Sequence, residues 1–278
     1  MRVGRIPYIN CYPVYGAIDR KVVALDAQLV DGIPTALNRA MAAGTLDVSV
    51  ISAVEYARDA SRYLLLPDVS ISCDGPVRSV MLFSRVPAEL LNARRVLVSR
   101  SSMTSVALLE LLFTNVWRSN PVFVPADAEI ADLDRSGADA HDARLIIGDA
   151  ALMLTAGASA LAHDYPYVYD LGSTWKDWTG LPFVFAVWVA QRTTPVADSL
   201  AVHAQLIQSR DWGLAHLDTL SAQAAVATGV SREKAHEYLS GLDYGLRYEH
   251  LAGLTAFFGK LAASGRVPNG SLAFLPAA

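Results

Sequence analysis

Cysteine is scarce in this sequence: Cys11 and Cys73 are the only two among 278 residues. They form no CxxC pair, and no His/Cys cluster has metal-ligand spacing, so we predict neither a disulfide framework nor a metal or other cofactor. Long apolar runs are lacking too, since none approaches the roughly 18 uninterrupted apolar residues of a membrane span. The 23 Lys and Arg do not exceed the 27 Asp and Glu, and a net charge of −4 argues against a nucleic acid partner.

Two further absences concern location and catalysis. Residues 1–7 lack the apolar core of a secretory signal, so we expect a reduced, cytoplasmic protein. The six histidines all fall outside the strand ends and turns considered below, which disfavours a Ser-His-Asp or Cys-His catalytic arrangement. The sequence does not indicate an oligomeric state.

The length predicts two lobes, because 278 residues is long for a single hydrophobic core. In two places a turn-rich segment leads directly into a continuous apolar run: residues 74–84 and residues 175–188. Such runs are typical of strands buried on both faces. We interpret them as two crossings between lobes that meet at a cleft, although two ordinary buried strands would give the same pattern. The predicted first lobe is 1–84 with 188–278, and the second is 85–187.

Strand and helix patterns alternate through both lobes, which predicts an α/β fold with helices covering parallel sheets. Strand patterns lie at 2–6, within 22–30, and at 47–51, 95–98, 122–124, 145–147, 167–171 and 183–189. Residues 10–13 are expected to form a loop, and Pro34 and Ser52 to begin helices. Four helices are expected after residue 195. The segment 127–144 is weakly patterned, and its structure stays open.

Three junctions place small polar residues directly after a strand and before a helix, at residues 51–52, 99–105 and 147–149, and Asn10 follows the first strand. The start of a helix offers unpaired N–H groups to an anion, and ligands of open α/β sheets bind at the carboxyl ends of strands. Plain helix capping explains any one junction, but together they predict a small anionic ligand between the lobes. The candidate binding residues are Ser52, Thr104, Ser105, Gly148 and Asp149.

Aromatic and cationic residues near these segments are further candidates. An aromatic lining of the cleft would come from Tyr8, Tyr12, Trp175, Trp178, Phe183 and Phe185, for which core packing is the alternative. Arg5, Arg78 and Lys176 are candidate partners of ligand carboxylates, and solvated surface charge is the alternative for each.

Five separated motifs resemble those of chorismate dehydratases of the futalosine route to menaquinone. They lie at residues 5–13, 72–79, 104–108, 147–152 and 175–188, in the family's order. The resemblance implies the fold of type 2 periplasmic solute-binding proteins, which has two α/β lobes, two crossing strands and a ligand in the central cleft. It also implies a lyase that removes water from chorismate. The family's important Asn and Ser match Asn10 and Ser79, the predicted catalytic residues.

The base that removes the proton is predicted from chemistry rather than from a motif. Because no histidine lies in these motifs, we hypothesise that the enolpyruvyl carboxylate of the substrate takes the proton from C3. Asp74 and Asp149 are the competing candidates. Two alternative functions stay open: 1,4-dihydroxy-6-naphthoate synthase of the same pathway, and a cytoplasmic protein that only binds a small anion.

Overall fold

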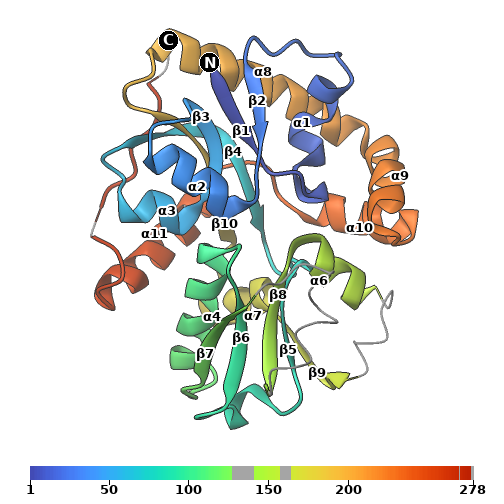
Figure 1. Ribbon diagram of the computed structural model, residues 1–278, viewed down its shortest axis with the longest axis vertical. Coiled ribbons are helices and arrows are strands. Elements are labelled where there is room, and N and C mark those ends of the chain that lie inside the picture. The colour runs from blue at the N-terminus through green and yellow to red at the C-terminus, as the bar shows by residue number, and fades with distance from the viewer. Residues whose placement is uncertain (127–140, 157–163, 269, 277–278) are drawn as a thin grey trace.

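Two five-stranded sheets, one in each lobe, organise the chain (Figure 1). The computed structural model describes residues 1–126, 141–156, 164–268 and 270–276. In spatial order the first sheet consists of β2 (Gln28–Asp31), β1 (Arg2–Arg5), β3 (Val48–Ser52), β10 (Phe183–Gln191) and β4 (Tyr63–Cys73). The second consists of β7 (Val122–Ala126), β6 (Arg95–Ser99), β8 (Ala143–Ile147), β5 (Val80–Ser84) and β9 (Tyr167–Asp170).

Both sheets are mixed rather than wholly parallel. β1 pairs in parallel with β2 and β3, and β6 does so with β7 and β8, as the alternating pattern predicts. β10 and β5 run antiparallel to both of their neighbours. These two strands follow the crossings, so each enters its sheet from the direction of the other lobe.

The chain passes between the sheets at residues 74–79 and 180–182. β4 ends in the first sheet and β5 begins in the second, whereas β10 begins in the first sheet after α7 (Leu171–Thr179). The predicted lobes are 1–84 with 188–278 and 85–187. These boundaries assign β5 to the first lobe, although it pairs in the second sheet, and they assign the first half of β10 to the second lobe, although it pairs in the first sheet. A turn followed by an apolar run predicts a buried strand, but it does not indicate in which of the two lobes that strand pairs. We propose lobes of residues 1–73 with 183–278 and of residues 74–182.

Seven helices of the described chain belong to the first lobe. They are α1 (Tyr12–Asp19), α2 (Pro34–Ala42), α3 (Ala53–Arg58), α8 (Val196–Ala215), α9 (Leu217–Thr228), α10 (Arg232–Gly241) and α11 (Tyr248–Ala263). The loop predicted at residues 10–13 is wrong, because a 3-10 turn η1 (Ile9–Cys11) leads directly into α1. Pro13 lies in the first turn of α1. A backbone N–H there makes no hydrogen bond within the helix, so the missing N–H of proline costs no helical hydrogen bond. α8 then packs along α1.

The second lobe carries α4 (Met103–Asn115), α6 (Gly148–Thr155) and α7, with a short 3-10 turn η2 (Ala88–Leu90) after β5. Ser102 caps α4, since its Oγ accepts the Ser105 N–H at 3.2 Å, and Asp170 caps α7 by accepting the Ser173 N–H at 3.0 Å. These caps begin helices immediately after strands, which brings polar side chains to the end of the sheet that faces the first lobe.

The tryptophan-rich segment before β10 is a helix rather than a polar loop. Trp175 is fully buried in α7 and packs edge-to-face against Phe183 and Phe257, with ring centroids 5.2 and 6.0 Å away. Its Nε1 donates to the Pro182 carbonyl at 3.2 Å. Trp178 lies beside Trp175, under the ammonium of Lys260. This cluster secures the second crossing against α11 instead of lining a cleft.

Candidate active site

A cavity of about 70 Å³ lies between the lobes, where the carboxyl ends of β3, β6 and β8 meet the residues after β1. Four of the predicted residues with polar side chains line it together: Asn10, Ser52, Ser79 and Ser105. Gly148 and Ser102 line it as well. Its apolar wall is formed by Ile6, Tyr8, Pro34, Ile71, Val77, Val80, Ile147, Phe185 and Ala186. Asn10 and Ser52 come from the first lobe, and Ser105 comes from the second.

Asn10 brings an unsatisfied acceptor to this cavity. It lies on η1, and its Oδ1 is buried without a hydrogen-bond partner among the described residues. A buried amide oxygen without a partner costs free energy, and sites of ligand contact are where that cost is compensated. The geometry suits acceptance of a hydrogen bond from a ligand hydroxyl.

Ser79 lies at the end of the first crossing and is 3% exposed. Its Oγ accepts a hydrogen bond from the Tyr238 hydroxyl at 2.8 Å, and its own hydroxyl donates to the Val77 carbonyl at 3.3 Å. Burial raises the pKa of Tyr238, which keeps this phenol protonated and able to donate. The crossing is held by Asp170, whose carboxylate accepts the N–H groups of Val77 and Arg78 at 3.1 and 2.7 Å. Arg78 itself has a φ of +59°, a conformation that needs such support.

Ser52 is arranged as a hydrogen-bond donor to the cavity. Its Oγ accepts from the Glu55 N–H at 3.2 Å, which confirms the predicted N-cap of α3, and from Asn38 Nδ2 at 3.0 Å. Asn38 Oδ1 also accepts the Ser52 N–H at 3.1 Å. With both lone-pair sites of Oγ engaged, the Ser52 hydroxyl hydrogen is left to donate to a ligand.

Ser105 has the same character in the second lobe. The Ser102 hydroxyl donates to Ser105 Oγ at 2.7 Å and accepts the Ser105 N–H at 3.2 Å. The Ser105 hydroxyl is then free to donate into the cavity. The amides of Glu55 and Ser105, in the first turns of α3 and α4, are already bonded to protein oxygens, so hydroxyls rather than these main-chain N–H groups face a ligand.

Gly148 lines the cavity through its backbone. Its φ is +63°, and a Cβ there would lie 3.3 Å from the Tyr8 ring. Its N–H donates to the Ser79 carbonyl at 2.7 Å, so this amide binds the protein rather than a ligand. A side chain at this position would strain the backbone and press on Tyr8.

Thr104 and Asp149 do not line the cavity. Thr104 Oγ1 accepts the Val54 N–H at 3.2 Å and so links α4 to α3 across the two lobes. The Asp149 carboxylate accepts the Ile9 N–H at 3.3 Å, directly beside Asn10. Both residues therefore position the walls, and a direct role in substrate binding stays a prediction.

The cavity contains no side chain with the usual character of a base. Tyr8 is the only ionisable residue among the described residues that line it. Burial raises the pKa of the nearby Cys11 thiol, so this cysteine is held as a neutral thiol. Among the described residues no group of three His, Cys, Asp or Glu is arranged to hold a metal ion.

The cations predicted to meet a ligand lie elsewhere and are paired. Arg5 binds the carboxylates of Asp19 and Asp31, and Lys176 binds Asp74 at 2.5 Å. Arg78 binds Glu237 at 2.9 Å. This prediction is wrong, because each cation forms an ion pair with a carboxylate of the protein. The two partners of each pair lie far apart in the sequence, so local patterns do not reveal them.

The predicted aromatic lining is correct only in part. Tyr8 and Phe185 line the cavity, whereas Tyr12 and the Trp175 cluster do not. The sequence missed Tyr238, Asn38 and Asp170, whose positions beside cavity residues depend on long-range packing. Within the described residues, we find no helix with the length and apolar character needed to span a membrane.

Comparison with known proteins identifies the family. A chorismate dehydratase of Thermus thermophilus is 31% identical over 240 residues, which cover 83% of this chain and 85% of the relative. A solved structure from Archaeoglobus fulgidus superimposes with a TM-score of 0.75 at 20% identity, covering 96% and 98% of the two chains. The alkanesulfonate-binding protein SsuA of Xanthomonas axonopodis pv. citri superimposes with a TM-score of 0.68 at 15% identity, covering 98% and 95%.

These structural neighbours confirm the predicted two-lobed, periplasmic-binding-protein-like fold. The family model for menaquinone biosynthesis matches residues 1–263, nearly the whole chain. The predicted family is therefore confirmed: this chain belongs to the menaquinone biosynthesis family.

Proposed function

We propose that this chain is a carbon–oxygen lyase that removes water from chorismate to give 3-[(1-carboxyvinyl)oxy]benzoate. The observation that carries the proposal is that Asn10 and Ser79, the two residues matched to the family's important pair, line one cavity. The relative named chorismate dehydratase, which matches most of the chain, supports the same activity.

The reaction breaks the C3–H and C4–O bonds of chorismate and leaves an aromatic ring. The C3 hydrogen is vinylogous to the ring carboxylate, so its loss moves negative charge onto that carboxylate, and expulsion of the C4 hydroxyl as water then completes the ring. Aromaticity drives the second step. The protein has chiefly to stabilise charge on the carboxylate, for which preorganised donors are each worth about 3–4 kcal/mol.

The side chains of the cavity supply donors and one acceptor for these groups. Ser52 and Ser105 have hydroxyl hydrogens that no acceptor in the described part of the chain uses, and we assign them to the substrate carboxylates. Ser79, whose oxygen accepts from Tyr238, is assigned to the charge that develops in the transition state, and its hydroxyl would turn from the Val77 carbonyl to donate there. Asn10 Oδ1 is assigned to the leaving C4 hydroxyl, whose hydrogen it can accept.

We assign the base to the enolpyruvyl carboxylate of the substrate. Among the described residues that line the cavity Tyr8 is the only ionisable one, so we take the carboxylates there from the substrate. The proton taken from C3 then leaves with the C4 hydroxyl as water, so that atoms and charge balance. No cofactor is invoked, and a cytoplasmic location stays a prediction.

The test is to incubate the purified chain with chorismate and follow loss of diene absorbance and formation of the benzoate by mass spectrometry. Ser79→Ala and Asn10→Ala should each lower kcat by about 10²-fold or more. Ser240→Ala, on the exposed surface of α10, is the matched control and should leave kcat unchanged.

Other outcomes would redirect the assignment. Chorismate that is bound but recovered unchanged would favour a small-anion-binding protein. If Asp149→Ala abolished turnover and left chorismate affinity intact, the base would be Asp149. Esterifying the enolpyruvyl carboxylate should stop conversion of bound substrate, and an ester that still reacts would contradict the substrate-derived base.

A further inference from the structure

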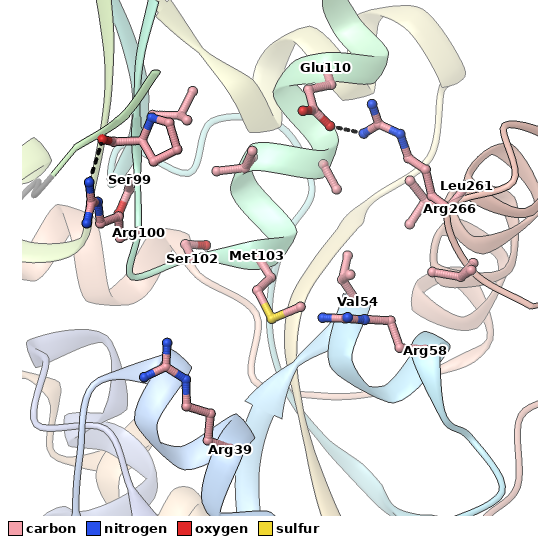
Figure 2. A pocket seen from close by; sticks show the side chains of 15 residues that line it. Arg39, Val54, Arg58, Ser99, Arg100, Ser102, Met103, Glu110, Leu261 and Arg266 are labelled. Carbon is pink, nitrogen blue, oxygen red and sulfur yellow. Dashed lines mark hydrogen bonds and ion pairs between the residues drawn. The ribbon is translucent and has the colours of Figure 1, made fainter. Parts of the chain in front are cut away.

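A second hollow, a groove of about 760 Å³, lies between the lobes beside the cavity (Figure 2). Four arginines and one glutamate are the charged residues that line it: Arg39, Arg58, Arg100, Arg266 and Glu110. All four arginines are exposed. Its formal charge of +3 (four minus one) contrasts with the net charge of −4 of the whole chain.

Arginines from both lobes face this groove. Arg39 and Arg58 lie in the last turns of α2 and α3 in the first lobe, and Figure 2 shows Arg58 directed toward Met103 and Arg39 directed toward the second lobe, below Arg100. Arg100 precedes α4 in the second lobe, where its Nη2 donates to the Pro125 carbonyl at 3.1 Å. Arg266 is paired with Glu110 on the far side.

The charges of Arg39 and Arg58 are not neutralised by a direct partner. Within the described ranges neither forms an ion pair with a carboxylate, although Glu55 interacts with Arg58 at longer range. Several arginines elsewhere in the described chain do form ion pairs: Arg94, for example, binds Asp142 at 2.8 Å. Glu55 and Asp59 line an adjoining hollow, and Asp59 is bound there by Arg62.

The groove adjoins the cavity. Ser102 lines both, and Met103, which follows it, lines the groove but not the cavity. Across this boundary Met103 Sδ lies 3.3 Å from Asn38 Nδ2, the amide that also holds Ser52. The Met103 side chain is flexible, and its displacement costs little free energy. A movable side chain therefore separates a ligand in the groove from the cavity.

We infer that this groove collects the dianionic substrate and delivers it past Met103 to the cavity. The inference rests on the proposed function. A chain of net negative charge repels a dianion at long range, and a cationic cleft with low-dielectric walls reverses this locally and raises the association rate. The role belongs to Arg39, Arg58 and Arg100, which lie outside the cavity and act on approach.

The experiment is stopped-flow mixing of the full chain with chorismate, in which the association rate constant is read from intrinsic tryptophan fluorescence. In about 0.01 M salt, Arg39→Gln combined with Arg100→Gln should slow association about fivefold, and in about 1 M salt the difference should disappear as charges are screened. Arg39→Lys combined with Arg100→Lys should retain the wild-type rate, because the charge is kept, and equal rates of the Gln pair and the wild type at high salt would exclude a folding defect. The matched control is Arg95→Gln, at the opposite, exposed end of β6 from Arg100.

Each outcome bears on the inference. Equal rates for the Gln pair and the wild type at low salt would overturn it, as would a loss that persists at high salt. Wild type that binds chorismate with this salt dependence yet does not convert it would refute the proposed function and leave the groove inference standing. Wild type that does not bind chorismate would refute both.

Discussion

The phenol of Tyr238 donates a hydrogen bond to Ser79 Oγ at 2.8 Å, although 159 residues separate them in the chain. Both side chains are buried, and Tyr238 comes from α10, one of the C-terminal helices that contribute little to the family motifs. This bond fixes the direction in which the Ser79 hydroxyl can donate. The C-terminal helices therefore help to form the site and do not merely cover the first sheet.

Tyr238→Phe should lower kcat about tenfold with little change in KM. Without the phenol, Ser79 can rotate away from the position that meets developing charge, and one tenfold loss corresponds to about 1.4 kcal/mol. Steady-state kinetics on chorismate measure both constants. The matched control is Tyr244→Phe, because the buried Tyr244 hydroxyl has no partner among the described residues and its loss should not lower kcat or stability. Equal kcat in Tyr238→Phe and wild type would contradict this role.

Asn38→Ala should lower kcat/KM about tenfold. The substitution removes both amide contacts to Ser52, so the Ser52 hydroxyl is no longer directed into the cavity, and a tenfold loss is about 1.4 kcal/mol. Asn115→Ala is the control, since its amide only donates to the Leu111 carbonyl within α4. If both variants behave alike, the Asn38 contacts have no functional role.

Asp170→Asn should both destabilise the protein and reduce turnover. The Asp170 carboxylate accepts backbone N–H groups from the first crossing and from the start of α7, and charge-assisted bonds of this kind are worth about 1.5–3 kcal/mol each. The neutral amide keeps one acceptor, so we expect a loss of roughly 2 kcal/mol in urea unfolding. Activity should fall further than stability alone explains, because Arg78 and Ser79 lose their support. Unchanged unfolding would refute the role of this carboxylate.

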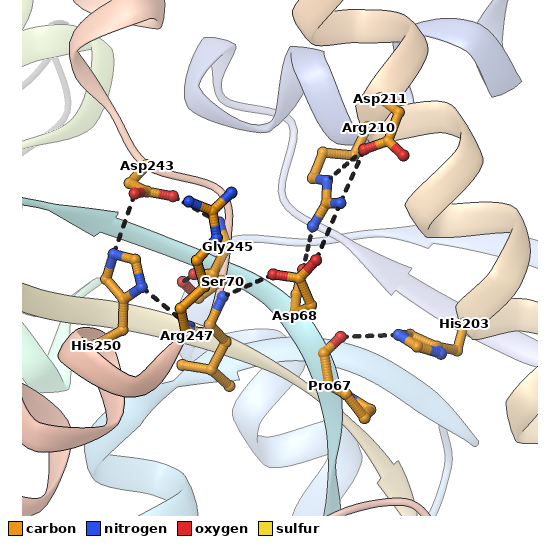
Figure 3. A network of polar contacts seen from close by, with 11 residues as sticks. Pro67, Asp68, Ser70, His203, Arg210, Asp211, Asp243, Gly245, Arg247 and His250 are labelled. Atoms are coloured by element: carbon orange, nitrogen blue, oxygen red, sulfur yellow. Dashed lines mark hydrogen bonds and ion pairs between the residues drawn. The ribbon is translucent and has the colours of Figure 1, made fainter. Parts of the chain in front are cut away.

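The pair of Asp243 and His250 predicts a pH-dependent stability term (Figure 3). His250 Nε2 lies 3.2 Å from Asp243 Oδ2, and Nδ1 accepts the Arg247 N–H at 3.1 Å, which assigns the proton to Nε2. The hydrogen bond from His250 is the main cause that lowers the pKa of Asp243 from 3.8 to about 2. A depressed carboxyl pKa stabilises the fold above about pH 4, and this contribution is lost as the pH falls toward 2.

Asp243→Asn should therefore destabilise the protein at neutral pH and cease to do so in acid. Because 39% of the Asp243 side chain is exposed, solvent screening reduces the expected effect to about 1 kcal/mol. Urea unfolding of both proteins at several pH values between 7 and 2 measures it, with Asp26→Asn, an exposed carboxylate, as the control. A difference that stayed constant down to pH 2 would contradict the assignment.

Local patterns predicted much of the secondary structure correctly. The predicted cap at Ser52 and the helix start at Pro34 are confirmed, because a cap depends only on a few neighbouring residues. The other strands of both sheets were predicted near their observed positions for the same reason, but β4 was missed. The errors at residues 10–13 and around Trp175 came from proline and tryptophan, which occur in loops and in helices alike and are placed by their packing.

The sequence by itself determined the two α/β lobes and the polar residues that follow their strands, since periodicity and capping are local properties of a chain. Tertiary structure alone decided that Asn10, Ser52, Ser79 and Ser105 share a cavity. It also decided that Tyr238, Asn38 and Asp170 hold their neighbours in place, and that four arginines gather in the adjoining groove. The physical reason is that hydrogen bonds and charges act over a few ångströms in space, and only folding brings residues so far apart in the chain to that distance.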